Sequence, residues 1–530
     1  MKKIRVLLLL ISVPAFLIAE ESLSESIEPS SVENSSEFTS LKDYAGEDYD
    51  ARYWILKGLD HNFSLQIGRM EVLNSTDRVT ISLGSLAPRL TSAIRYRESE
   101  RAQNRQQFLA LDEIDSIFEE KVASLELRLE DRFAFGTQVA ITSSTSRLDN
   151  TTNRNINPST LTGPLFFPEY QTTTQLQVIQ PLLKNRGVKT NLAATNLARS
   201  EGLGTEFQLR SEVDRTIAQI LVAFAETEFG LDNLRVKVDA VQLANDLIDQ
   251  NRRRVEEGVM SPIDVTQAEA RLAEAKEEVV GARTFLAERQ NRLLELTGTD
   301  YTFGQEAPIR GSVSDVLKAP EKDRIVIGQE MLVRNPIYLA ALERARAEGI
   351  RVAFAKNQLL PQLDLEATVG TNGLEDSFGG SFEDFSNRDR LDWSVGLVLS
   401  MSLDRSADRA QVSLAKRVQA QALMTAKQTE VQLLVLLDNS MREVEAAQER
   451  IGFANEAVRL AEEALRSEER RLSSGLTTSY NVLNQQRDLS FARTRALASE
   501  VELFRAVAQL YVVTGSLGDQ LNLDLTFAAN

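Results

Sequence analysis

Two copies of one turn, centred on Gly258 and on Gly475, constrain the fold of this chain more than any other feature. The helical pattern after each turn also ends alike, at Leu296–Thr297–Gly298 and at Val513–Thr514–Gly515, so the two ends are separated by the same interval as the two glycines. A repeat that holds its spacing this well indicates a duplicated structural unit. We therefore expect one helix–turn–helix unit to occur twice.

Very long helices flank each turn. In the first copy we expect a helix from about Asn191 to Glu257, which would be roughly 100 Å long at 1.5 Å per residue. Apolar residues recur along it at heptad spacing, which is typical of a coiled coil. The predicted seam, which recurs at the equivalent positions of the second copy, is Ile217, Ile220, Phe224, Thr227, Leu231, Leu234, Val238 and Val241.

The helix that follows each turn has a seam with many small residues. In the first copy the seam is Val265, Ala268, Leu272, Ala275, Val279, Ala282, Leu286, Arg289, Leu293 and Leu296. Small residues let helices approach closely. We expect helices laid tightly in the wall of a cylinder, and a plain coiled-coil rod is the alternative.

A second repeated unit precedes the helices, and its two copies lie further apart than the two turns do. Pro88 corresponds to Pro361, and alternating apolar and polar residues follow each proline. Such alternation is typical of a half-buried strand, and runs of about ten residues match a tilted strand that crosses a bilayer. A strand of a soluble β-sandwich is the alternative for any one run. In the last strand the predicted lipid-facing residues are Trp393, Val395, Leu397 and Leu399.

The first copy carries an insertion between its strands. Because the interval from Pro88 to Pro361 exceeds that from Gly258 to Gly475, the first copy must contain extra residues, which lie within about 98–168. Apolar residues occupy odd positions from Leu125 to Ile141, a run too long for one crossing. We expect a hairpin that bends near Phe133–Gly136, followed by an exposed loop at 148–168. Either the hairpin adds strands to a barrel or it caps the barrel outside.

The last strand of the first copy ends at Pro181 and Leu182. Proline interrupts a sheet ladder, so these residues are predicted to form the strand-to-helix junction. By these boundaries the first repeat covers 51–298 and the second covers 333–515. Residues 299–332 are expected to form a linker with short elements, and 516–530 a C-terminal tail.

The N-terminus has the features of a signal peptide at 1–19. Lys2, Lys3 and Arg5 precede an apolar run that is too short to be a convincing membrane-spanning helix. Residues 20–50 are rich in Ser and Glu and are expected to be disordered. No later apolar stretch is long enough to predict a transmembrane helix.

The composition excludes several kinds of site. The chain has no cysteine and a single histidine, His61, which rules out disulfides and leaves little support for a zinc site or a histidine-based triad. The net charge of −17 argues against binding to nucleic acid. We expect no enzyme activity, no cofactor and no metal.

Together these motifs resemble the TolC-like outer-membrane efflux proteins. The resemblance covers about residues 54–515 and rests on their order: helix, strands, Gln-Pro-Leu-Leu at 180–183, long helix, glycine turn and Ala-rich helix, most of it twice. It implies a mainly α fold with membrane β-strands. Three identical chains would share one outer-membrane β-barrel, continued by a periplasmic α-helical barrel.

The resemblance also implies a function in the cell outer membrane and the periplasm. The chain would be the exit duct of a tripartite drug-efflux pump or a type I secretion complex, passing small molecules or proteins without catalysis. Its partners would be a periplasmic adaptor (a membrane fusion protein), an inner-membrane transporter and outer-membrane lipid. The alternative is a periplasmic coiled-coil structural or adaptor protein, which accounts for the helices but not for the paired strands.

Simple geometry agrees with a trimer. The duplicated unit predicts four strands per chain, which cannot close a barrel, and open sheet edges cannot face lipid. Three copies would supply about twelve strands, within the range of known barrels.

By the same resemblance, the helix turns form the periplasmic aperture, where the adaptor docks. The predicted aperture residues are Gly258, Pro262, Asp264, Gly475, Asn481 and Asn484. The predicted adaptor-contact tips are Arg254, Val259, Met260, Arg471, Leu476 and Thr477.

The turns also depart from the family's pattern. Asp264 keeps a turn-proximal carboxylate in the first copy, whereas the second copy has amides at Asn481 and Asn484. The tyrosine and arginine of the family's closed-state latch are replaced by Leu472 and Thr477. Closure would therefore need other contacts, for which Arg252–Arg254 and Glu469–Arg471 are candidates, although ordinary solvated charge at a helix end also explains them.

Overall fold

The computed structural model describes residues 49–102, 117–151, 168–298, 301–312, 316–320, 323–386 and 391–523. The predicted signal peptide, nearly all of segment 20–50 and most of the predicted loop at 148–168 lie outside these residues. The chain forms two compact units. Of the described residues, the hairpin unit contains those from 49 to 66, from 212 to 334 and from 436 to 523, and the sheet unit those from 67 to 211 and from 335 to 435.

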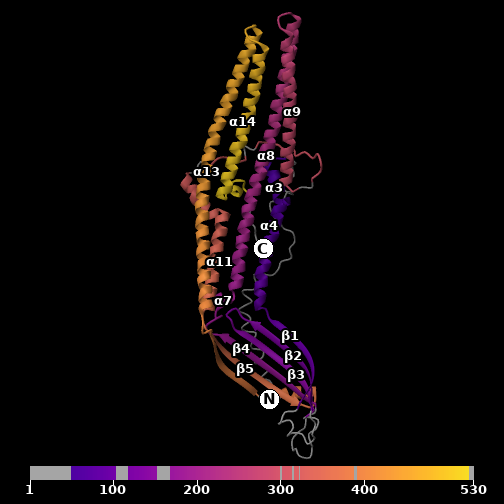
Figure 1. The fold of residues 1–530 in the computed structure, drawn as a ribbon, viewed down its shortest axis with the longest axis vertical. Helices are drawn as coiled ribbons and strands as arrows, with labels where there is room; N and C mark the ends of the chain where they lie inside the picture. Colours follow the sequence, from indigo (N-terminus) through magenta and orange to yellow (C-terminus); the bar gives the residue numbers. More distant parts are fainter. Residues whose placement is uncertain are drawn as a thin grey trace, which may run out of the picture. The chain divides into compact units, whose positions relative to one another are not determined.

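The sheet unit is built on six antiparallel strands in the order β1-β2-β3-β4-β5-β6 (Figure 1). Their bounds are β1 Arg89–Ala102, β2 Ile117–Arg132, β3 Gln138–Asn150, β4 Glu169–Pro181, β5 Gln362–Glu375 and β6 Leu391–Ser400. The predicted hairpin bend is confirmed, because the amide of Gly136 donates to the Phe133 carbonyl at the β2–β3 turn. The expectation of four strands is wrong: the inserted hairpin adds β2 and β3 to the same sheet.

The two faces of this sheet differ in polarity. Directly paired residues of neighbouring strands share a face. One paired row across the sheet is apolar in all six strands and consists of Leu90, Leu129, Ile141, Leu176, Val369 and Trp393. The opposite face carries charged and polar residues, among them Arg95, Arg128 and Glu366, with an ion pair between Arg95 and Glu126 at 2.8 Å. We call these the apolar face and the polar face.

Five helices lie wholly or partly in this unit. They are α4 Phe63–Leu83, α7 Val188–Asn191, the first part of α8 Ala193–Glu256, α11 Pro336–Gln358 and the first part of α13 Ser406–Ser473. The short 3-10 helix η3 Gly84–Leu86 leads from α4 into β1, and a further short helix, α12 Phe378–Ser386, lies between β5 and β6. Among the described residues, no helix combines the length and the hydrophobicity of a membrane span.

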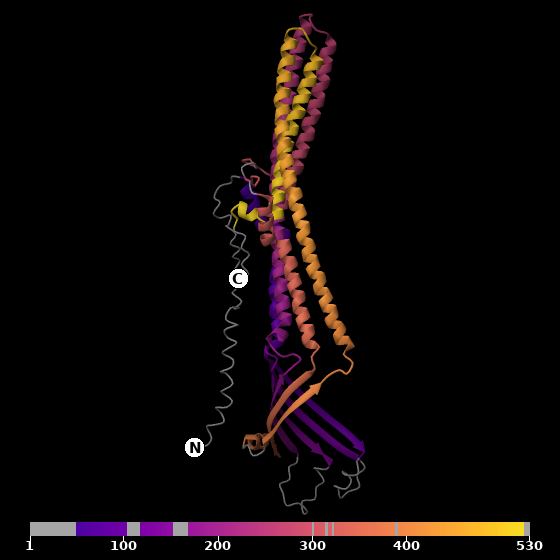
Figure 2. The same ribbon diagram turned by 90° about the vertical axis from the view of Figure 1, so that its left-hand side faces the viewer.

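The hairpin unit contains the remaining helices and the ends of α8 and α13. They are α3 Ala51–His61, α9 Pro262–Leu296, α10 Arg324–Arg334, α14 Ser479–Thr514 and α15 Leu517–Gln520. In both ribbon views α8 lies beside α9 and α13 beside α14 (Figure 2). The predicted long first helix is confirmed: α8 has 64 residues, so it is about 96 Å long.

The core of this unit lies where α3 meets the helical hairpins. Trp54 and Leu59 are buried together with Ile220 and Leu293. A β-carbon on Gly58 would lie 2.2 Å from Cδ1 of Ile220, so a larger residue there would force the buried Ile220 side chain to move. The Asn62 amide fixes the end of α3 by donating to the Leu296 carbonyl at 2.7 Å.

The predicted seams are right for α9 and α14 in most positions and shifted in the first helix of each copy. Val238, a predicted seam residue, is 47% exposed, and burial resumes at Ala244, Leu247 and Ile248. In α13 the buried positions are Leu433, Leu437, Ser440, Val444, Ala447, Ala454, Leu465 and Leu472. A straight helix drifts by about 20° per heptad relative to a strict seven-residue repeat, so a seam extrapolated over many turns loses its register.

Candidate functional site: the ends of the helical hairpins

The two turns have the same backbone geometry. Gly258 and Gly475 have φ values of 76° and 70°, the left-handed region that other residues adopt rarely. The amide of the next residue reaches back to a carbonyl five residues earlier: Val259 to Arg254 at 3.0 Å, and Leu476 to Arg471 at 2.9 Å. This is the Schellman ending of a helix. Nothing lies within 4 Å of a β-carbon built on either glycine, so φ rather than space requires glycine here.

The following helices start differently in the two copies. Ser261 caps α9, accepting from the Ile263 amide at 3.4 Å, and Pro262 follows in the first helical turn, where its lack of an amide hydrogen costs nothing. In the second copy Thr478 is the cap residue and its side chain makes no capping hydrogen bond.

All four helices share one apolar cluster behind the turns. Its buried members are Leu247 and Ile248 of α8, Ala268 of α9, Leu465 and Leu472 of α13, and Val482, Leu483 and Leu489 of α14. Met260, predicted as an adaptor-contact tip, is half-buried and packs against this cluster. The two hairpins are therefore packed as one body close to their turns.

Polar contacts also join the two hairpins. The Arg254 guanidinium of α8 donates to the Leu472 carbonyl of α13 at 3.1 Å. Next to this contact, Asn251 and Ser479 are both fully buried, and the Ser479 hydroxyl donates to the Asn251 side-chain oxygen at 2.8 Å. The Asn251 amide in turn points to the Asp264 carbonyl at 3.5 Å, so one buried side chain links α8, α9 and α14.

The charged and amide side chains of the second turn make their contacts within their own hairpin. Arg471 pairs with Glu468 of its own helix at 3.0 Å. The Thr477 hydroxyl also donates to Glu468, and the Asn481 amide donates to the Thr477 hydroxyl at 3.0 Å. Arg471 and Arg254 are equivalent in the repeat, yet only Arg254 reaches the other hairpin.

The outer surface of the turns carries exposed apolar side chains. Val259 and Leu476 follow the two glycines and are 72% and 71% exposed. Ile263 and Tyr480 are also exposed. Asp264 and Asn484 are half-buried, whereas Asn481 is exposed.

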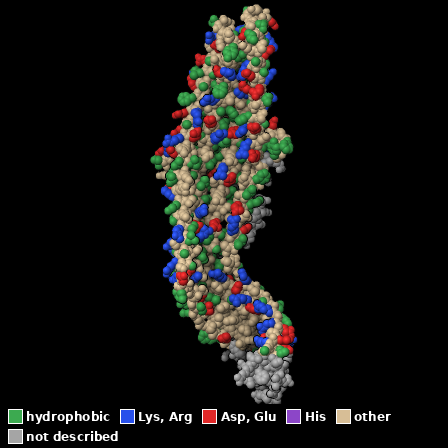
Figure 3. Space-filling view, viewed as in Figure 1, with side chains coloured by type: hydrophobic (Ala, Val, Ile, Leu, Met, Phe, Trp, Pro, Cys, Tyr) green, Lys and Arg blue, Asp and Glu red, His purple; other side chains and the backbone are tan. Residues whose placement is uncertain are grey.

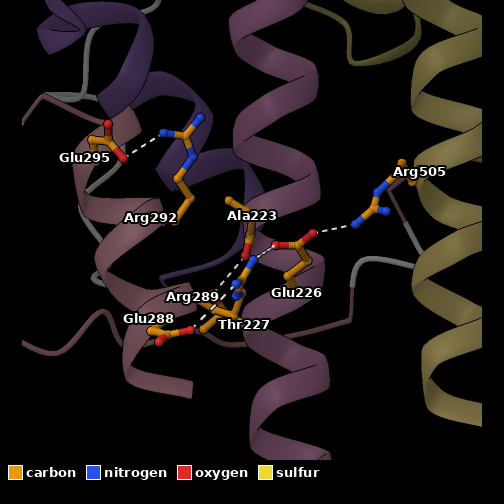
Figure 4. A network of polar contacts seen from close by, with 8 residues as sticks. All are labelled: Ala223, Glu226, Thr227, Glu288, Arg289, Arg292, Glu295 and Arg505. Carbon is orange, nitrogen blue, oxygen red and sulfur yellow. Dashed lines mark hydrogen bonds and ion pairs between the residues drawn. The ribbon is translucent and has the colours of Figure 1, made fainter. Parts of the chain in front are cut away.

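Two ion clusters further along the hairpin unit escaped the sequence analysis. Glu226 of α8 accepts from Arg289 of α9 at 3.0 Å and from Arg505 of α14, which connects three helices (Figure 4). A single sequence shows each of these residues as an ordinary charge on a helix. In the space-filling view, positive and negative side chains are interspersed over the visible face (Figure 3). The residues of an ion cluster therefore do not stand out from the other surface charges.

The second cluster is centred on Glu278 of α9. Its carboxylate meets Lys237 of α8 at 3.1 Å and Arg271 at 3.2 Å, and Lys237 also donates to the Ser490 hydroxyl of α14 at 3.3 Å. Burial alone would raise the pKa of Glu278, but the hydrogen bond and charge of Lys237 and the charge of Arg271 outweigh it, so the pKa lies below its usual value.

The remaining predicted residues lie in the sheet unit. Trp393, Val395, Leu397 and Leu399 lie on the apolar face of β6, and all four are exposed. Pro181 is the last residue of β4, and the Leu182 amide still donates to the Leu363 carbonyl at 2.7 Å. The junction is packed against the β2–β3 turn, since the Gly187 amide donates to the Phe135 carbonyl at 3.0 Å.

The chain matches a known protein family over most of its length. The profile of the family described as outer membrane efflux protein matches residues 122–299 and 327–516, which include the strands β3 to β6 and all four hairpin helices. The chain belongs to the outer membrane efflux protein family. It is accordingly an efflux channel of the outer membrane that extends into the periplasm, and the family is one of transport proteins. This excludes the alternative of a periplasmic structural or adaptor protein.

Individual relatives of this efflux protein are distant. The chain is 23% identical over 344 residues to the probable efflux pump outer membrane protein TtgC of Pseudomonas putida, which covers 62% of this chain and 68% of the relative. It is 28% identical over 157 residues to the fusaric acid resistance protein FusA of Burkholderia cepacia, covering 30% of this chain and 28% of that protein.

Solved structures share its fold. The outer membrane protein VceC of Vibrio cholerae superposes with a TM-score of 0.60 at 18% identity, covering 88% of this chain and 96% of VceC. The CmeC outer membrane channel of Campylobacter jejuni superposes with a TM-score of 0.61 at 14% identity, covering 92% of each chain. The predicted fold class, a TolC-like combination of membrane strands and long helices, is confirmed.

Proposed function

We propose that three copies of this chain form the exit duct of a tripartite efflux pump. A signal peptide at 1–19 would direct each chain across the inner membrane. A periplasmic adaptor would dock at the hairpin ends and connect the duct to an inner-membrane transporter. The duct itself would perform no chemical step and would pass its cargo passively.

The observation that carries this proposal is the pair of open edges of the sheet. β1 and β6 each pair with one strand only within the described residues, so each leaves a row of backbone amides and carbonyls without a strand partner. In a bilayer no water satisfies these groups, and the edge must be closed by another strand. Six strands are fewer than the eight of the smallest membrane barrels.

Association of identical chains closes the edges without changing the strand order. Because the sheet is antiparallel throughout and has an even number of strands, β1 of one copy runs antiparallel to β6 of the next. Three copies then give eighteen strands instead of the twelve expected from four strands per chain. With strands about 4.8 Å apart and tilted by about 40°, the barrel radius rises from about 12 Å to about 18 Å.

Exposed apolar side chains on the bordering helices support the same association. α4 exposes Phe63, Ile67, Met70, Leu73 and Ile81, and the first part of α13 exposes Leu414, Leu423, Met424, Val431 and Val435. Apolar surface of this extent on a helix marks a contact with another protein or with lipid. α4 leads into β1 and α13 follows β6, so these helices continue the two edges of the sheet.

The hairpin ends fit the inner mouth of the duct. Exposed Val259 and Leu476 offer apolar anchors to an adaptor, next to the charged residues Arg254 and Arg471. Small organic molecules are the proposed cargo, because relatives of this chain are named as outer membrane proteins of toluene and antibiotic efflux pumps.

The test is the behaviour of the native protein in envelope fractions. We expect it in the outer membrane as a trimer that resists SDS until it is heated. Size analysis in detergent should give three chains per particle, and end-on electron microscopy should give the wide barrel. A soluble monomer, or a barrel of twelve-strand diameter, would contradict the proposal.

A further inference from the structure

The short helix α12 lies on the apolar face of the sheet, at the end of the strands away from the long helices (Figure 2). It contacts β5 and β4. Gly373 of β5, which is buried under α12, pairs with Thr172 of β4, and the same paired row continues through Thr145 and Leu125 to Ile94. Because Ile94 and Leu125 belong to the apolar face, α12 rests on that face.

α12 is fixed to the sheet by specific contacts. The Ser381 hydroxyl hydrogen-bonds the Thr172 hydroxyl at 2.9 Å, and both residues are fully buried. The Asp384 carboxylate accepts from the Leu374 amide at 3.1 Å. A β-carbon on Gly373 would lie 2.1 Å from the Ser381 carbonyl oxygen, so the helix can dock this closely only over glycine. These contacts make α12 a docked element of the sheet unit.

The surface under and beside α12 is polar, although the rows from Leu90 to Ile94 on β1 and from Leu125 to Leu129 on β2 are largely apolar on the same face. Where β1 and β2 present Ile94 and Leu125, β3 and β4 present hydroxyls. Two cross-strand hydroxyl pairs occupy this patch, Ser143 with Thr174 at 2.9 Å and Thr145 with Thr172 at 3.2 Å. Even with these pairs formed, a hydroxyl patch is less favourable against lipid than apolar side chains are, because polar groups lose their hydration there.

The outward side of α12 is aromatic. Phe378 and Phe382 are one helical turn apart, and each is 54% exposed. The Phe382 ring also contacts the Phe385 ring, with centroids 5.7 Å apart. α12 therefore places two phenylalanines over a stretch of sheet that has no apolar side chains of its own.

We propose that α12 is a lipid-contact helix whose Phe378 and Phe382 insert into the outer leaflet of the outer membrane. This inference rests on the proposed barrel, in which the apolar face meets lipid. Side chains of the sheet then supply the lipid-facing surface over β1 and β2, and α12 supplies it over β4 and β5. Short amphipathic helices with a phenylalanine face bind at this depth of a bilayer. The next paired row toward the same end combines Tyr96 and Tyr170 with Arg147 and Glu375, as expected where a membrane barrel passes from lipid into the polar interface.

The absence of cysteine from the sequence permits a direct test. Single cysteines at Phe382, at Leu397 of the apolar face and at Ser394 of the polar face would carry a nitroxide label in full-length trimers in liposomes. Collision rates with oxygen, which concentrates in lipid, and with a water-soluble nickel complex would be measured at each site. We expect the oxygen-to-nickel ratio at position 382 to be within about twofold of that at 397 and about fivefold or more above that at 394.

A second variant distinguishes the contribution of α12 from that of the sheet on which it is docked. Gly373→Val should displace α12, lower the ratio at position 382 several-fold and leave the ratio at 397 unchanged. A water-like ratio at 382 with a lipid-like ratio at 397 would overturn the lipid-contact helix while leaving the barrel intact. Low collision rates with both reagents at 382 would mean that protein covers α12, which also overturns the inference. A water-like ratio at 397 would instead contradict the proposed barrel.

Discussion

Arg254 donates a hydrogen bond to the main-chain carbonyl of Leu472, across the boundary between the two helical hairpins, at 3.1 Å. Its repeat equivalent, Arg471, pairs with Glu468 on its own helix instead. The duplicated turns have the same backbone conformation, but their equivalent arginines have different partners. Leu472 accepts this bond with its carbonyl, while its side chain is buried in the apolar cluster that the four helices share.

Removing this contact should loosen the inner mouth of the duct. A hydrogen bond from a charged donor contributes about 1–2 kcal/mol, so Arg254→Ala should shift a closed–open equilibrium by about fivefold or more per subunit. Single-channel recording in planar bilayers should show longer openings. Arg471→Ala is the matched control, because an exposed pair within one helix contributes little. Equal effects of the two substitutions would contradict the assignment of the contact between hairpins.

The buried pair of Asn251 and Ser479 should hold the hairpin ends together. Ser479→Ala would leave the Asn251 oxygen buried without its partner, at a cost of about 1–3 kcal/mol. Hydrogen exchange at the ends of α8 and α14 should accelerate accordingly. The double variant Asn251→Leu/Ser479→Ala removes both polar groups and should be closer to wild type than Ser479→Ala alone. A double variant that exchanges faster than the single one would show that the pair is not responsible.

The Glu278 cluster makes stability depend on pH. Lys237 and Arg271 hold the pKa of this carboxyl below its usual value of 4.5. The unfolded chain therefore binds a proton more readily than the folded one, so the stabilisation is present above about pH 4.5 and is lost as pH falls through the folded pKa. Glu278→Gln should lower the unfolding free energy at pH 7 by about 1 kcal/mol, discounted for partial exposure, with the difference shrinking at acidic pH.

Thermal unfolding at several pH values would measure this effect. Glu277→Gln, at the exposed neighbouring position, is the control and should be close to neutral throughout. A constant difference between Glu278→Gln and wild type from pH 7 down to pH 3 would mean that the ion cluster is not its source.

The charge at the aperture should be unequal within each subunit. Asp264 follows the first turn, while the equivalent residue after the second turn is Asn481. Rings of carboxylates favour cations, whereas amides bind them weakly. Asp264→Asn should therefore reduce the cation-to-anion permeability ratio, measured as a reversal potential, more than Asn481→Ala does. Similar shifts from both variants would place the selective charge elsewhere in the duct.

Much of the fold was predictable because its sequence pattern is repeated within the chain. The glycine turns, the long helices and the alternating strands that follow Pro88 and Pro361 each occur twice, and the structure contains them all. The strand count was wrong for a physical reason. Alternation from Leu125 to Ile141 predicts a hairpin, but whether it joins a sheet depends on backbone pairing with β1 and β4, which a periodic pattern does not encode.

The polar contacts at the hairpin ends could not be predicted from the sequence. Asn251 and Glu226 lie on α8, which is rich in polar residues. Only the neighbouring helices of the structure show that Asn251 is buried and that Glu226 binds two arginines. α12 was missed for another reason. Its nine residues include Gly379 and Gly380, which are poor helix formers, so tertiary contacts with β4 and β5 determine its conformation.

Closure of the sheet between copies is the central claim, and disulfide trapping tests it most directly. Cysteines would be placed in pairs, one along β1 at Leu90, Ser92 or Ile94 and one along β6 at Val395, Leu397 or Leu399. β1 and β6 are opposite edges of the sheet in one chain, so these cysteines can join only different chains. At least one register should give a covalent ladder that ends at three chains in non-reducing gels of outer-membrane fractions. No cross-link in any register, or a ladder that extends beyond three, would contradict a trimeric barrel.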